Sequence, residues 1–177
     1  MIIRAIRESD GEQFLLLGKL LDEETQFMML EPGERILTVE EQMQKIKSVL
    51  SRDNQIIFVA EHENQLVGYL GAFGGDYRRN RHCAHIVTGI RQSFAGQGIG
   101  NRLFAALEKW ALDHKLHRLE LTVMSHNERA VRLYQKMGYK TEGLKQDSLW
   151  VNGKYVDEYY MAKILGQSQS TGAQQGA

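Results

Sequence analysis

Hydrophobic positions in the first part of the chain change between the spacing expected for strands and the spacing expected for helices. Ile2–Ile6 predicts a short strand, and Ser9-Asp10 is expected to cap a helix whose apolar residues in Phe14–Leu21 recur on one face. Thr38 lies three residues before Glu41, which is the form of a capping box at the start of a second helix. The pattern therefore predicts one strand followed by two helices.

Three strands are predicted in the middle of the chain. Gln55–Glu61 and Gln65–Gly74 are rich in β-branched and aromatic residues, and the polar turn at Glu63-Asn64 makes them an antiparallel pair. Cys83–Ile90 is a third candidate strand, which leads into a glycine-rich turn and then a helix. That helix carries its apolar residues on one face, at Leu103, Phe104, Leu107, Trp110 and Ala111.

The last third of the chain repeats the order of strand and helix and then ends in a hairpin. Leu119–Val123 alternates as a strand, Asn127 opens a helix, and Gly138 closes it. Alternating residues flank Asn152-Gly153, which is a strong hairpin signal. Together these elements predict an α/β (α+β) fold with a mixed, mainly antiparallel central sheet flanked by helices.

Length and charge indicate one globular domain. The chain has 177 residues, which corresponds to about one domain, and we assign residues 1–165 to it. Gly166–Ala177 is uncharged and poor in apolar residues, so we expect this tail to be disordered. The 22 Lys and Arg balance the 22 Asp and Glu, which leaves no overall field to attract nucleic acid.

Several classes of protein are excluded by what the sequence lacks. A single cysteine, Cys83, provides neither a disulfide framework nor a Cys-rich zinc site, and the histidines lack metal-ligand spacing. No metal is expected. The N-terminus is charged from Arg4 onward, and no apolar run approaches 18 residues, so neither a signal peptide nor a membrane span is predicted. We expect a cytoplasmic protein.

The glycine-rich turn Gly96-Gln97-Gly98-Ile99-Gly100-Asn101 places three glycines where a strand passes into a helix. Such a turn presents backbone N–H groups and the positive end of a helix dipole, which predicts a phosphate-bearing ligand. A P-loop would need Lys and then Ser or Thr after the last glycine, but Asn101-Arg102 stands there. A nicotinamide nucleotide is a weaker alternative, with Glu120 as its ribose-binding acid.

Two motifs together resemble the acetyl-CoA-binding core of the GNAT family of N-acetyltransferases. The first is Ile90–Asn101 with its following helix, and the second is Asn127–Tyr139. They occur in the family's order and spacing, and the order of elements over residues 2–165 matches the family's fold. One departure is Ala95, at a place where the family usually has Gln or Arg, so a side-chain contribution to pyrophosphate binding is absent there.

The resemblance implies transfer of the acetyl group of acetyl-CoA to a primary amine, which is a small amine, a polyamine or a peptide amine. The amine attacks directly in a ternary complex without a covalent enzyme intermediate, so Cys83 is not a nucleophile but a small hydrophobe on a strand. Dimers are common in the family, so a homodimer is expected, although no feature of the sequence identifies an interface. The alternative is a non-catalytic acyl-CoA-binding sensor or interaction module.

The family's cofactor-binding and acid roles are carried to matching residues. Thr88, Gly89 and Ile90 would pair with the pantetheine arm, and the N–H of Ile90 would donate to the thioester oxygen. Gly89 within a strand also predicts a bulge or the close approach of another backbone, or relief of side-chain crowding. Tyr134 would protonate the departing sulfur, although its spacing also fits a core position. Asn127 would contact the cofactor as well as cap its helix.

The base and the substrate are less well defined. His85 and Glu120 are candidate bases, and each is also compatible with a structural or solvated role; Thr122 stands where some relatives carry a catalytic glutamate. Substrate recognition is expected from the loop at Glu23–Arg35, the loop at Gly75–Arg81, and the closing hairpin. The acidic cluster Asp22-Glu23-Glu24 would attract an amine, or would form a solvated face. The hairpin sequence resembles those of relatives acting on polyamines and on ribosomal protein termini.

Overall fold

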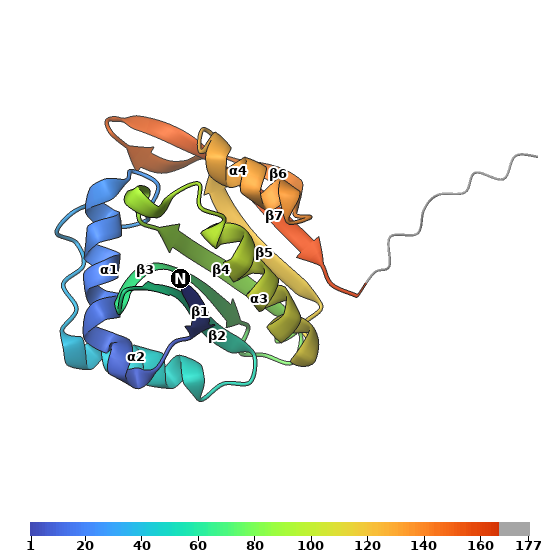
Figure 1. Cartoon of the computed structure of the whole chain (residues 1–177). Helices are drawn as coiled ribbons and strands as arrows, with labels where there is room; N and C mark the ends of the chain where they lie inside the picture. The colour runs from blue at the N-terminus through green and yellow to red at the C-terminus, as the bar shows by residue number, and fades with distance from the viewer. Residues whose placement is uncertain (167–177) are drawn as a thin grey trace, which may run out of the picture.

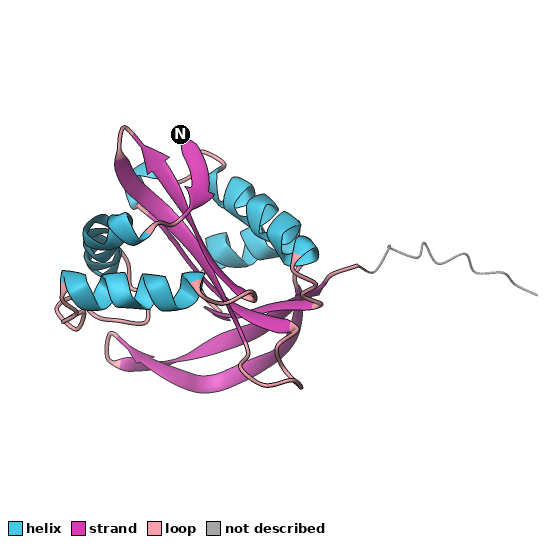
Figure 2. Ribbon diagram, turned by 90° about the horizontal axis from the view of Figure 1, so that it is seen from below, coloured by secondary structure: helices cyan, strands magenta, loops and turns pink. Residues whose placement is uncertain are grey.

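The computed structural model describes residues 1–166, and the expected tail lies outside the described residues except for Gly166. Within this range the chain forms one seven-stranded sheet with helices on both faces (Figures 1 and 2). The strands are β1 (Ile2–Ala5), β2 (Gln55–His62), β3 (Gln65–Gly74), β4 (Cys83–Ile90), β5 (Arg118–Met124), β6 (Lys140–Val151) and β7 (Lys154–Ile164). The α-helices are α1 (Gly11–Glu24), α2 (Val39–Leu50), α3 (Ile99–Asp113) and α4 (Glu128–Lys136), and short 3-10 turns lie at Glu8–Asp10 and Gln92–Phe94.

The sheet has the strand order β1-β2-β3-β4-β5-β7-β6, and every neighbouring pair is antiparallel except β4 and β5. This confirms the mixed, mainly antiparallel sheet that the sequence predicts. The parallel pair is short, because it begins at Cys83–Arg118 and ends at His85–Glu120. The two central strands therefore separate beyond His85, and this separation positions the candidate site.

Two apolar clusters hold the helices to opposite faces of the sheet. The larger cluster joins α3 and α4 to the sheet, with Leu103, Leu107 and Tyr134 among its members. The smaller cluster joins α1 and α2 to β2 and β3 through residues such as Leu21 and Ile46. Figure 2 shows the sheet between the two groups of helices. The sheet is therefore covered on both faces over β2 and β3, by α1 and α2 on one side and by α3 on the other.

Local signals at three turns are confirmed. Thr38 Oγ1 accepts a hydrogen bond from the Glu41 N–H (3.2 Å), and the Glu41 carboxylate accepts one from the Thr38 N–H (2.8 Å), which completes the capping box. Glu63 and Asn64 both have positive φ between β2 and β3, and so do Asn152 and Gly153 between β6 and β7. These conformations match the tight turns that favour antiparallel hairpins.

Two expectations about the elements are wrong. Asp10 occupies the N-cap position of α1 but makes no side-chain cap bond to that helix, because its carboxylate instead accepts hydrogen bonds from the Arg4 guanidinium and the Arg7 N–H. In addition, β6 begins at Lys140, whereas the sequence pattern shows no strand before Leu149. β6 is an edge strand with two register shifts, so its early residues are largely exposed and lack apolar alternation.

Replacing Asp10 with Asn is expected to lower the free energy of unfolding by roughly 2 kcal/mol at pH 7. Arg4 donates two hydrogen bonds to this buried carboxylate (2.7 and 2.9 Å), and chiefly for that reason its pKa lies below the ordinary 3.8. A lowered pKa stabilises the fold above about pH 3.8, and the contribution is lost as the pH falls further. Urea unfolding of both proteins at pH 7 and pH 3 measures this difference, which should shrink at pH 3.

The exposed carboxylate of Asp53, which pairs with Arg81 at 2.9 Å, provides the control. Replacing Asp53 with Asn is expected to change stability by less than about 0.5 kcal/mol, because exposed ion pairs contribute little. Equal effects of the two substitutions would contradict the structural role given to Asp10.

Candidate active site

Backbone groups of β4 face an open gap beyond the point where β5 separates from it. The Arg91 N–H donates to the Val67 carbonyl of β3 (2.9 Å), and consecutive residues direct their N–H groups to opposite sides of a strand. The N–H groups of Thr88 and Ile90 therefore face away from β3, toward β5. The β4–β5 ladder has already ended at His85, so these groups are left available to a ligand.

The glycine-rich turn lies directly beyond this gap and begins α3. Gly98 is the N-cap residue, and both Gly96 (φ +81°) and Gly98 (φ +77°) have left-handed backbones with no other atom within 4 Å of a Cβ position. The Arg102 N–H makes the first helical bond, to the Gly98 carbonyl (3.2 Å). The N–H groups of the residues between them have no acceptor within the helix, which leaves an open cradle of donors for an anion.

Two other glycines have packing roles. A Cβ at Gly100 would lie 2.7 Å from Leu133 Cδ2, so this glycine lets α3 approach α4 closely. A Cβ at Gly89 would lie 2.7 Å from Leu21 Cδ1, which supports relief of side-chain crowding by α1. The expected bulge at Gly89 is wrong, because β3 and β4 pair without a register shift from Gly74–Ala84 to Gly68–Ile90.

A cavity of about 590 Å³ connects the gap, the cradle and the end of α1. Its volume lies in the range usual for small-molecule sites. Along β4, the glycine-rich turn and α4 it is lined by His85–Ile90, Ala95, Gly96, Gly98–Asn101, Asn127 and Tyr134. On the other side it is lined by Leu21, Glu24, Thr25, Phe27, Met28, Met29, Leu149 and Glu158. The structure thus brings the predicted cofactor-binding residues to one cavity, with the exception of Gln97.

Tyr134 is both a core residue and part of the cavity wall. Its ring contacts Phe104 edge-on, with centroids 5.6 Å apart, and only 8% of the residue is exposed. Burial raises the pKa of its phenol above the ordinary 10.0, so the group stays protonated at neutral pH. No residue in the range 1–166 is hydrogen bonded to this hydroxyl. Because the hydroxyl oxygen is also not fully enclosed, it is accessible from the cavity that Tyr134 lines. Both interpretations of Tyr134 from the sequence are compatible with this position.

Two asparagines place amides beside the cradle. Asn127 caps α4, because its Oδ1 accepts a hydrogen bond from the Ala130 N–H (3.3 Å), and it also lines the cavity. Asn101 Oδ1 is buried without a hydrogen-bond partner among the described residues. An orphaned buried acceptor beside free backbone donors is typical of a site that a polar ligand completes.

The two candidate bases differ in position. His85 is exposed and lines the cavity, on the same face of the sheet as its register partner Glu120. Glu120 does not line the cavity, and its carboxylate is bound to Arg118 (2.7 Å). Cys83 is half-buried on the same face, and burial, together with Glu120, raises the pKa of its thiol to about 11. A thiol with that pKa is protonated at neutral pH, which makes it a poor nucleophile.

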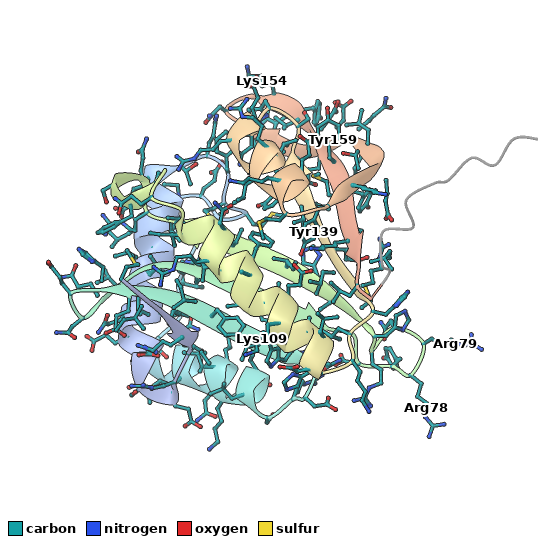
Figure 3. The ribbon with its side chains drawn as sticks, turned by 45° about the vertical axis from the view of Figure 1, so that its right-hand side comes forward. Arg78, Arg79, Lys109, Tyr139, Lys154 and Tyr159 are labelled. Carbon is teal, nitrogen blue, oxygen red and sulfur yellow. The ribbon has the colours of Figure 1, made fainter. Side chains whose placement is uncertain are left out.

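The expected substrate-recognition segments fall in different places. The loop after α1 lines the cavity at Thr25 and at residues 27–29, and the hairpin contributes Leu149. The loop at Gly75–Arg81 lies elsewhere, and Figure 3 shows Arg78 and Arg79 projecting at the opposite end of the molecule from Lys154. This loop enters β4 at its first residue, whereas the cavity lies at the strand's last residues, so that expectation is wrong.

The acidic cluster at the end of α1 is mainly structural. Asp22 is buried and accepts two hydrogen bonds from Arg35 (2.7 and 2.9 Å). Glu24 lines the cavity, but its oxygens accept hydrogen bonds from Arg91 Nε (2.6 Å) and the Gln92 N–H (2.8 Å). These contacts tie the end of α1 to the segment that precedes the glycine-rich turn.

Glu158 is a cavity residue that the sequence interpretation missed. It is 4% exposed on β7, where it pairs with Met124, the last residue of β5. The sequence does contain a signal for this residue in the alternation of buried and exposed positions along the hairpin. Glu158 lies two residues after the buried Val156, so it places a carboxylate at a position where an apolar side chain is expected.

Two kinds of feature are absent from the described part of the chain. Over residues 1–166, no group of three or more His, Cys, Asp or Glu side chains is arranged to hold a metal ion. None of the helices in this range is long and apolar enough to cross a membrane.

Comparisons with known proteins agree with the geometry of the site. The model of the acetyltransferase (GNAT) family matches residues 19–139. An L-amino acid N-acetyltransferase of Escherichia coli K12 is 29% identical over 110 residues, which cover 60% of this chain and 66% of the relative. A GNAT-family acetyltransferase structure from Streptococcus pneumoniae has a TM-score of 0.90 and 29% identity, covering 93% of this chain and 99% of its own.

A Salmonella typhimurium protein described as a putative acetyltransferase, solved with acetyl-CoA, shares the fold at a TM-score of 0.84 and 16% identity, with 98% of each chain covered. The family model spans more than half of the present chain, and it includes both the glycine-rich turn and the helix that carries Tyr134. The chain therefore belongs to the GNAT family of acetyltransferases, with acetyl-CoA as co-substrate.

Proposed function

We propose that this protein transfers the acetyl group of acetyl-CoA to a primary amine by direct attack within a ternary complex. The observation that carries the proposal is the cavity itself, which joins the free N–H groups of β4, the cradle at Gly96–Asn101 and the Tyr134 hydroxyl. The name of the Escherichia coli relative, an L-amino acid N-acetyltransferase, supports an amine as the acceptor.

The residues of the cavity fit acetyl-CoA by their chemistry. The cradle supplies N–H donors and a helix N-terminus for the diphosphate, and glycines at 96 and 98 leave the approach open. The N–H and carbonyl groups of β4 at Thr88 and Ile90 are free to pair with an amide-containing arm such as pantetheine. These contacts would hold the thioester between β4 and α4.

The chemical roles follow from this placement. The Ile90 N–H would donate to the thioester oxygen as negative charge develops there, and one such donor can contribute about 3 kcal/mol to transition-state stabilisation. The Tyr134 phenol, kept protonated by burial, would give its proton to the departing sulfur. Cys83 takes no part, because its raised thiol pKa opposes nucleophilic attack.

The test is a thiol-release assay with acetyl-CoA and a panel of L-amino acids, polyamines and peptides with free N-termini. We expect thiol release that depends on one class of amine and a product heavier by one acetyl group in mass spectrometry. A thermal-shift assay compares CoA with NAD, and only CoA is expected to stabilise the protein. Binding of CoA without acetylation of any panel member would contradict catalysis and favour a sensor role.

A further inference from the structure

Glu158 is a buried carboxylate placed at the wall of the acetyl-transfer cavity. It lies on β7 opposite Met124, at the end of the β5–β7 ladder, and only 4% of it is exposed. A charged side chain in such a position is costly unless it is paired, so its partners decide its role.

One oxygen of this carboxylate is held by the protein, whereas the other is not. Oε2 accepts a hydrogen bond from Ser148 Oγ (2.9 Å) and lies 3.4 Å from Lys145 Nζ. Oε1 has no hydrogen-bond partner within the described part of the chain. Oε1 is also not fully enclosed, so it is accessible from the cavity that Glu158 lines. Ser148 thus fixes the orientation of a carboxylate whose second oxygen is available.

The surroundings of Oε1 suit a single positively charged group. Glu24 is the other carboxylate of the cavity wall in residues 1–166, and both of its oxygens are already occupied by Arg91 and the Gln92 N–H. Met28, Met29 and Leu149, which line the same cavity, have apolar side chains that offer no competing acceptor. A primary ammonium, with three N–H donors and one positive charge, is the complement of such a site.

We propose that Glu158 binds the ammonium group of the acceptor and takes its proton, an inference that rests on the proposed acetyl transfer. In this step an N–H bond breaks and an O–H bond forms at Glu158, which leaves the nitrogen lone pair free. The nitrogen then bonds to the thioester carbon, and the C–S bond breaks as Tyr134 gives its proton to the sulfur. The second proton lost from the nitrogen restores the phenol, and Glu158 releases its proton to solvent through the cavity.

The test compares Glu158→Gln with the wild-type protein on the best amine of the panel. At pH 7 we expect kcat/KM for the amine to fall about 100-fold, whereas the Kd for acetyl-CoA stays unchanged. The variant should recover as the pH rises, because the free fraction of the amine increases between pH 7 and pH 9, about 100-fold for a pKa near 10.4 and about sevenfold for an α-amine with a pKa near 7.8. A merely structural role would not produce this recovery.

The matched control is Asp157→Asn at the adjacent position, whose carboxylate accepts a hydrogen bond from the Asp147 N–H (2.8 Å) on the opposite face of the strand. This variant is expected to keep the wild-type kcat/KM at both pH values. If Glu158→Gln fails to fold, Glu158→Ala gives the test, and its kcat/KM is expected to recover between pH 7 and pH 9 in the same way, because it also lacks the carboxylate.

The outcomes separate this inference from the proposed function. Wild-type turnover together with an unchanged Glu158→Gln variant, or with a loss that is the same at pH 7 and pH 9, would overturn the role of Glu158 alone. Absence of wild-type turnover on every amine would overturn the proposed function and this inference with it.

Discussion

Replacing Tyr134 with Phe is expected to lower kcat about 100-fold while leaving the Kd for acetyl-CoA unchanged. The substitution removes a hydroxyl that has access to the cavity and keeps the ring, which packs against Phe104 in the core. Without the phenol, the sulfur departs as a thiolate that no nearby acid neutralises. Steady-state kinetics with the best amine, together with isothermal titration of acetyl-CoA, measures the two quantities.

Tyr139 provides a matched control for this prediction. It is also buried in the core against Phe104, with ring centroids 5.6 Å apart, and Figure 3 labels it, but it does not line the cavity. Tyr139→Phe is therefore expected to retain most of the wild-type kcat.

Burial raises the pKa of both phenols above the ordinary 10.0, so Tyr134 would stay protonated as an acid throughout the neutral and mildly alkaline pH range. Wild-type turnover by Tyr134→Phe would refute its role as the acid.

Replacing Gly98 with Asp is expected to weaken acetyl-CoA binding about tenfold more than replacing it with Asn. Both side chains tolerate the left-handed backbone at φ +77° better than other non-glycine residues, and they differ in charge rather than in shape. The additional carboxylate would lie against the diphosphate, where like-charge repulsion near a surface costs about 1–2 kcal/mol. Titration calorimetry of the two variants measures the difference.

Two further measurements connect this difference to the phosphates. The difference in acetyl-CoA affinity between the Asp and Asn variants should decrease in high salt, because exposed charges are screened. It should also vanish for acetyl-pantetheine, which lacks the diphosphate. Equal acetyl-CoA affinities of the two folded variants would remove the cradle from the binding site.

Features that depend on neighbours in the sequence could be predicted well. The capping box at Thr38, the hairpin at Asn152-Gly153 and the strand–turn–helix unit around Gly96–Gly100 are each set by a few adjacent residues, and the structure contains all of them. The edge strand β6 was recognised only at its end, since an edge strand packs on few neighbours and its sequence shows little apolar alternation.

Features that depend on the arrangement of strands were harder to predict. The loop at Gly75–Arg81 precedes β4 and the glycine-rich turn follows it, so the extended strand keeps this loop away from the cavity. Glu120 is paired with Arg118 and does not line the cavity, an arrangement that the spacing of residues along one strand does not define. Glu158 lies at the cavity wall because β7 inserts between β5 and β6, an order that local patterns do not reveal.

The short parallel ladder between β4 and β5 makes the stability of the sheet sensitive to the bound ligand. Three residue pairs, from Cys83–Arg118 to His85–Glu120, join the two halves of the sheet. A bound pantetheine arm would act as a strand inserted at this seam and add hydrogen bonds to one side of it. Acetyl-CoA at 100 times its Kd would then raise global stability by about 2.7 kcal/mol, and amide hydrogen exchange should slow in β4 and β5 together rather than at the glycine-rich turn alone.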